Sequence, residues 1–105
     1  MKFTIRATDS AILDHIEAAS WLERQEEGLG RAFEAEVSAA VRRLEDEALL
    51  HSVRFRDVRR AGVQRFSSFG LFYVVRETEV TLFAIVHGAR NPAWVRRRRS
   101  NLRYG

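Results

Sequence analysis

The sequence predicts an α+β domain in which an antiparallel helical hairpin packs on one face of a mainly antiparallel sheet. In the first half, apolar residues recur at spacings of three and four, as on one face of a helix. In the second half, the pattern changes to alternating and β-branched runs, as in strands. The 105 residues fit one domain, 1–105, and 46% hydrophobic residues can form its core.

The first half contains a strand and two helices. Residues 3–7 alternate apolar and polar side chains, which predicts a half-buried strand. Residues 8–10, Thr-Asp-Ser, offer acceptors for a helix start, and a helix is expected through about Glu26. Its apolar stripe, expected to be its buried face, is Ile12, Leu13, Ile16, Ala19 and Ser20. Glycines at 28 and 30 break this helix, and a second one runs over residues 29–44, folded back on the first.

The second half is expected to form three or four antiparallel strands. Residues 53–58 and 62–66 alternate, whereas 71–75 and 80–87 are rich in β-branched and aromatic residues. A polar turn over residues 76–79 joins the last two strands as a hairpin. Because these two strands are almost continuously apolar, we expect them at the centre of the sheet, covered by the helices. The remaining residues are expected to form an arginine-rich tail.

Charge divides the chain into two unlike halves. Residues 1–50 carry 6 basic and 11 acidic side chains, whereas residues 51–105 carry 12 basic and 3 acidic ones. The asymmetry suggests that the second half faces a polyanion or an acidic partner. Arginine usage by the encoding genome is the alternative explanation for the excess of Arg over Lys. It does not explain why the arginines gather in the second half.

Composition also excludes several classes of protein. The chain has no cysteine, so it can form neither disulfides nor thiolate zinc sites, and this fits a reducing cytoplasm. No apolar run approaches the roughly 20 residues of a membrane span, and the first residues lack a signal-peptide core. His15 and His51 are interpreted as surface residues without metal-ligand spacing. We therefore expect a soluble, cytoplasmic protein without metal, cofactor or membrane contact.

Three stretches carry a resemblance to a known family. The first spans residues 17–33 and includes Trp21 and the glycines; the second is Arg59-Arg60, Arg65-Phe66 and residues 72–75; the third is residues 84–92, ending near Trp94. In this order they resemble the RelE/ParE toxins of type II toxin–antitoxin systems. The sequence departs from the family pattern at three places: Leu22, Glu47-Ala48 and residues 66–69.

The resemblance implies one of two activities. In the ribonuclease branch, RNA cleavage needs an acid, a base and several cations, among them an arginine that opens the central strand. This sequence has Gly70 there, and Ala61 and Val63 where lysines are expected, although Arg60 or Arg65 could substitute from a neighbouring strand. The gyrase-poisoning branch lacks that set and needs only a binding surface, so the sequence is closer to this ParE-like branch. A degenerate or stand-alone nucleic-acid-binding module is the third alternative.

The candidate site residues follow from these alternatives. If the chain is a ribonuclease, its catalytic candidates are Arg60, Arg65, His87 and Arg90. Target or antitoxin binding would use Arg60, Arg65, Arg90, Trp94, Arg96 and Arg97. Each has a structural alternative: His87 can cap the last strand, the arginines can be solvated or paired with the acidic helices, and Trp94 is expected to anchor to the core. Trp21, which is not among the candidates, is expected to pack in the core or in the helical hairpin.

The resemblance also implies partners. A cognate antitoxin would fold a disordered, often acidic segment onto the toxin. DNA gyrase is the expected target, with the ribosome and its mRNA as the alternative. Operator DNA would be contacted only through the antitoxin.

Overall fold

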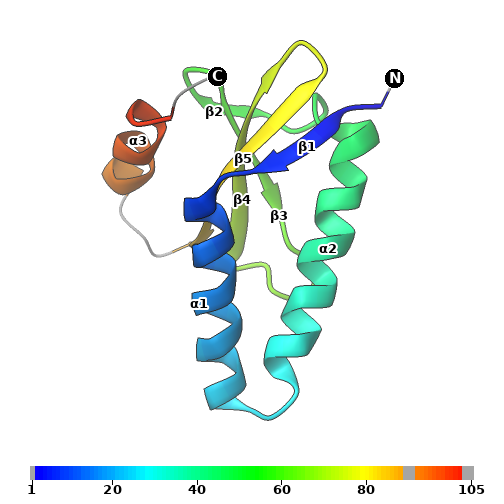
Figure 1. Cartoon of the computed structure of the whole chain (residues 1–105), viewed down its shortest axis with the longest axis vertical. Coiled ribbons are helices and arrows are strands. Elements are labelled where there is room, and N and C mark those ends of the chain that lie inside the picture. The colour runs from blue at the N-terminus through cyan, green and yellow to red at the C-terminus, as the bar shows by residue number, and fades with distance from the viewer. Residues whose placement is uncertain (1, 89–91, 103–105) are drawn as a thin grey trace.

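The computed structural model describes residues 2–88 and 92–102 of the chain (Figure 1). Its elements, in chain order, are β1 (Thr4–Ala7), α1 (Asp9–Gln25), α2 (Leu29–Glu47), β2 (Val53–Phe55), β3 (Val58–Gly62), β4 (Phe69–Arg76), β5 (Glu79–His87) and α3 (Pro92–Ser100). This confirms the predicted α+β class, with the N-terminal strand and the helical hairpin in the expected places. No helix within the described ranges has the length and apolar character that a membrane crossing requires.

The five strands form one mixed sheet in the order β1-β5-β4-β3-β2. β1 pairs with β5 in parallel, and the other neighbours are antiparallel. The two most apolar strands, β4 and β5, lie at the centre as predicted. The register of β1 on β5 ends at Ala7 opposite Leu82, so the last five residues of β5 extend beyond β1.

Local interactions determine the geometry of the helical hairpin. Thr8 caps α1, because its Oγ1 accepts a hydrogen bond from the Ala11 N–H at 3.1 Å. Gly28, before α2, has a φ of 88°, which favours glycine. The carboxylate of Glu23 accepts the N–H groups of Gly28 and Gly30 at 2.8 and 2.9 Å. These bonds satisfy amides at the start of α2 that have no partner within the helix.

Two hydrophobic cores lie on opposite faces of the sheet. The larger core lies under the α1–α2 hairpin and includes Phe33, Leu44, Leu71 and Tyr73, all with 0% exposure. The smaller core includes Val58, Val74 and Phe83 and is closed by Val95 of α3. Figure 1 shows α3 set apart from the hairpin. The second core therefore depends on a helix that the sequence analysis interpreted as a tail.

The expected buried face of α1 was wrong in part. Three residues of the predicted stripe are about half exposed: Ile12 (48%), Leu13 (56%) and Ile16 (54%). The face that packs inward is formed by Ala11, Ala19 and Leu22. Small residues are needed there because the helices approach closely: a Cβ on Gly30 would stand 2.5 Å from the carbonyl oxygen of Ala19. Apolar spacing predicted the helix but not which of its faces is buried.

The strand boundaries in the middle of the chain also differ from those predicted. The expected strand 53–58 is interrupted by a turn at residues 56–57, where Arg56 has a φ of 49°. The expected strand 62–66 does not form, because β3 ends at Gly62 and Arg65 lies in a turn with a φ of 70°. A positive φ is rare for arginine, and nothing in the alternation of side chains indicates it.

The expected tail contains α3. Proline is favoured in the first turn of a helix, and arginine is a good helix former, so the sequence is compatible with this helix. The prediction of a tail rested on the arginine run and overlooked Val95, which is only 3% exposed.

Candidate functional site

A basic pocket of about 340 Å³ lies between α3, the β2–β3 hairpin and the end of β5. The name covers the residues that line it: Arg54, Phe55, Arg60, Phe72, Val86, His87, Gly88, Pro92, Val95 and Arg96. Its described lining thus combines three guanidinium groups and one imidazole with aromatic and aliphatic side chains. This combination suits a phosphate or a carboxylate, because arginine makes bidentate contacts with both.

Arg60 reaches the pocket because of a glycine on the adjacent strand. A Cβ on Gly70 would lie 2.8 Å from Cζ of Arg60, so the guanidinium occupies the space that a side chain at position 70 would fill. Burial, and then the charge of Arg54, lower the pKa of Arg60. Arg60, from β3, therefore places a cation at the start of β4, where position 70 is a glycine and supplies none.

The arginine run of α3 divides into different roles. Arg96 lines the basic pocket and lies over the ring of Phe55, with Cζ 5.2 Å from its centroid. Arg99 pairs with Asp57 through bonds of 3.0 and 2.7 Å, and the hydrogen bond from Arg99 lowers the pKa of that carboxyl. Arg97 is exposed and does not line the basic pocket.

Arg98 anchors α3 to the rest of the fold. Its guanidinium donates to both carboxylate oxygens of Asp14 and to the carbonyl oxygen of Phe83. The arginine run is thus neither a uniform nucleic-acid patch nor a solvated tail.

His87 is the last residue of β5 and is exposed. Its ring meets Phe69 edge to face, with centroids 5.2 Å apart. It lines the basic pocket and also the pocket next to it. This position is compatible with both roles considered for His87, proton transfer and a structural role at the strand end.

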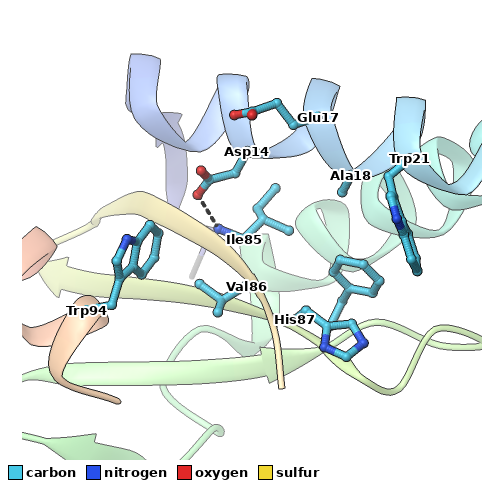
Figure 2. A pocket seen from close by; sticks show the side chains of 9 residues that line it. Asp14, Glu17, Ala18, Trp21, Ile85, Val86, His87 and Trp94 are labelled. Atoms are coloured by element: carbon cyan, nitrogen blue, oxygen red, sulfur yellow. Dashed lines mark hydrogen bonds between the residues drawn. The ribbon is translucent and has the colours of Figure 1, made fainter. Parts of the chain in front are cut away.

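The neighbouring cavity, here called the tryptophan pocket, has a volume of about 320 Å³ and lies between α1, α3 and the end of β5 (Figure 2). It is lined by Asp14, Glu17, Ala18, Trp21, Phe69, Ile85, Val86, His87 and Trp94. Trp21 is 47% exposed, so the expected role of this residue in packing was wrong. Trp94 is half-buried and packs on the smaller core, which confirms its expected role as an anchor.

The structure brings together some of the predicted site residues and separates others. Arg60, His87 and Arg96 meet in the basic pocket. Arg65 does not line it and instead lies over Phe66, with Cζ 5.5 Å from the ring centroid. Arg90 lies outside the described residues.

Arg54 and Phe55 were missed as site residues. Their alternation in residues 53–58 was visible in the sequence, but the turn that directs β2 toward α3 was not.

The histidines outside these pockets are half-buried, so they are less exposed than the surface residues expected from the sequence. His15 is stacked on Phe33, with ring centroids 5.6 Å apart, and its Nδ1 is buried without a hydrogen-bond partner among the described residues. His51 meets Tyr73 edge to face at 6.4 Å. Within the described part of the chain, no cluster of three His, Cys, Asp or Glu residues could hold a metal ion.

Comparison with known proteins gives a similarity of fold. No protein-family model matches the chain, and no curated protein matches it in sequence. Among solved structures, it is similar to a chain described as "Chromosomal ParDE TA system from P. aeruginosa", with a TM-score of 0.67. The two are 18% identical, and the match covers 82% of this chain and 96% of the other.

Proposed function

We propose that this protein is the toxin of a type II toxin–antitoxin pair and that it inhibits growth by poisoning DNA gyrase. The observation that carries the proposal is the similarity of fold to a chain of a ParDE system over most of both chains. The basic pocket adds a surface on which such a toxin could hold a phosphate or carboxylate of its target.

The composition of the basic pocket supports binding more than cleavage. Attack of a 2′-hydroxyl needs one group to accept a proton and another to donate one. Histidine is the side chain that exchanges protons near neutral pH, and His87 is the histidine among the described residues that line this pocket. The other polar side chains in the described part of its lining are arginines, which remain protonated in proteins. A gyrase poison needs no second proton-exchanging group.

A ribosome-dependent ribonuclease is the second candidate, and one observation favours it. Arg60 lies over Gly70 and lines the same pocket as His87, so a cation and a proton-exchanging group are close together. Cations aimed at the developing charge of a phosphate stabilise the transition state of such a reaction.

A cognate antitoxin is the proposed partner in either case. The second half of the chain carries 12 basic and 3 acidic residues, and this excess would attract an acidic antitoxin segment.

The test is inducible expression of the chain alone, with DNA and protein synthesis followed by incorporation of labelled precursors. Gyrase poisoning predicts that DNA synthesis falls first and that DNA damage responses rise. If translation falls first and mRNA fragments appear, the ribonuclease replaces the gyrase poison. Normal growth with folded protein present would contradict both and favour the third alternative, a binding module.

Variants connect the phenotype to the basic pocket. Arg60→Ala with Arg96→Ala should relieve growth inhibition, because two of the three guanidiniums are removed. Arg97→Ala is the matched control, since this exposed arginine belongs to the same helix but does not line the pocket. Equal toxicity of the double variant and the control would show that growth inhibition does not depend on the basic pocket.

A further inference from the structure

Two residues that line the tryptophan pocket, Asp14 and Trp94, already bind an arginine of the protein itself. Cζ of Arg98 lies 4.2 Å from the ring centroid of Trp94, and its guanidinium pairs with the Asp14 carboxylate at 2.9 Å. A cation over an indole and beside a carboxylate gains from both contacts. Both Asp14 and Trp94 line the pocket (Figure 2).

α1 contributes another acidic side chain and another indole to the lining of the pocket. Glu17 and Trp21 also line the pocket, and their spacing of four residues places them on the same face of the helix, one turn apart. Both are exposed, and Glu17 makes no hydrogen bond or ion pair with any other residue in the described ranges. Figure 2 shows Trp21 and Trp94 on opposite sides of the last residues of β5.

We propose that Glu17 and Trp21 bind an arginine side chain of a protein partner. The guanidinium would lie on the indole of Trp21 and pair with Glu17, as Arg98 does with Trp94 and Asp14. The aliphatic part of the arginine would contact the apolar wall formed by Ala18, Phe69 and Ile85. The cavity of about 320 Å³ has room for one such side chain.

Charge supports a cationic occupant. Among the described residues that line the tryptophan pocket, the acidic side chains are Asp14, which already pairs with Arg98, and Glu17, and none is a lysine or arginine. Glu17 is therefore the acidic group left for an occupant. The basic pocket has the opposite composition, with three arginines. Two cavities that share Val86 and His87 thus present opposite charges, so a partner can be recognised by acidic groups at one and basic groups at the other.

Arginine fits the pair better than lysine does. Its planar guanidinium can stack on an indole while its N–H groups donate to a carboxylate, and it is more weakly hydrated than an ammonium group. The exposed indole is a reason to expect a partner, because aromatic side chains and arginine are enriched at protein interfaces.

The test is an NMR titration of the folded chain with N-acetyl-arginine methylamide. The indole Nε1–H signal of Trp21, assigned with the Trp21→Phe variant, and the amide of Ala18 report binding. The neutral isostere N-acetyl-citrulline methylamide separates charge from shape. We expect saturable shifts with a millimolar Kd for the arginine compound and no saturation for the citrulline compound.

Variants test the assigned residues. Glu17→Gln should weaken binding about threefold, as expected for an exposed ion pair. Asp46→Asn removes an acidic residue of α2 that is exposed and does not line the pocket, so it controls for the overall charge. Binding equal in Glu17→Gln and the wild type would overturn the proposal, as would equal affinity for the two compounds.

Other occupants would give different results. Adenosine monophosphate that saturates the same signals at lower concentration than the arginine compound would identify a nucleobase platform and overturn the proposal. Shifts of these signals on dilution without any ligand would identify a second copy of this chain as the occupant and also overturn it. These readouts do not depend on growth inhibition, so the toxin proposal and this one can fail separately.

Discussion

Asp14 joins α1, β5 and α3 through a single carboxylate, and its removal is the most informative perturbation of the fold. Its Oδ2 accepts hydrogen bonds from the Ile85 N–H at 3.0 Å and from Arg98 at 2.9 Å, and its Oδ1 accepts a third from Arg98 at 3.3 Å. Since β1 pairs with β5 only as far as Leu82, Asp14 supplies the partner that a neighbouring strand would supply to Ile85.

The expected cost of Asp14→Ala follows from these contacts. The side chains of Asp14 and Arg98 are only 13% and 22% exposed, so water compensates little for the lost bonds. A hydrogen bond to a charged group contributes about 1.5–3 kcal/mol, and removing one member of a buried pair costs about 3–5 kcal/mol. Because the pair is only partly buried, we expect a loss of about 3 kcal/mol. For a domain of this size, that lowers Tm by roughly 12–24 °C.

The assay is a double-mutant cycle with Asp14→Ala, Arg98→Met and their combination, measured by urea and thermal unfolding. Because both side chains belong to one network, the coupling energy should exceed about 1 kcal/mol. Asp46→Asn, an exposed change, should stay within about 0.5 kcal/mol of the wild type. Additivity within about 0.5 kcal/mol, or a cost of Asp14→Ala below about 1 kcal/mol, would refute this account of how α3 is held.

Three further predictions concern single groups. Tyr73 donates a hydrogen bond of 2.6 Å to the Ala48 carbonyl, so Tyr73→Phe should cost about 1–2 kcal/mol in urea unfolding. Burial raises the pKa of Tyr73 from 10.0 to about 12. The neutral phenol therefore contributes to the free energy of unfolding below pH 10, and this contribution is lost as the pH rises toward 12. Tyr73→Phe should not show this loss. Hydrogen bonds from backbone N–H groups lower the pKa of Glu23 below 4.5. The contribution of this carboxylate to the free energy of unfolding is present above pH 4.5 and is lost as the pH falls through the lowered pKa. The difference in the free energy of unfolding between wild type and Glu23→Gln should therefore shrink in acid. Gly70→Ala should displace the guanidinium of Arg60 and weaken binding of inorganic phosphate in the basic pocket about tenfold, measured by NMR titration, with little change in the free energy of unfolding.

Each of these predictions has a result that would contradict it. Equal alkaline unfolding of Tyr73→Phe and the wild type would exclude the phenol as its cause. A difference between Glu23→Gln and the wild type that stays constant down to pH 2 would show that the charge of Glu23 is not involved. Unchanged phosphate affinity of Gly70→Ala would mean that the position of Arg60 over Gly70 does not matter for binding.

The elements that the sequence predicted well are those determined by local rules. The apolar periodicity and the glycines at 28 and 30 identified the helical hairpin, and the predicted start of the second helix at Leu29 is confirmed. The hairpin of β4 and β5 also followed from local signals, because a polar turn separates two runs of strand-forming residues. Such signals act within one or two turns of chain and need no knowledge of the rest of the fold.

The candidate site was only partly predictable, because its residues come from separate elements. Arg60, His87 and Arg96 were named from the sequence, but their common pocket depends on β3, β5 and α3 packing around the smaller core. Arg65 was grouped with them because it belongs to a family-like stretch and was placed on a neighbouring strand, but its positive φ puts it in a turn.

The sequence by itself determined the class of the fold, the helical hairpin and the concentration of positive charge in the second half. Tertiary structure decided which faces are buried and which charges act together. Ile16 and Trp21 are exposed although both are apolar, because Ala19 and Leu22 fit the close contact between the helices. Among the arginines of α3, the distance to an acidic partner decides the role: Arg98 and Arg99 have Asp14 and Asp57 within 3 Å, whereas Arg96 lines the basic pocket. Those distances exist only after α1, β5 and α3 have packed, so no periodicity along the chain could reveal them.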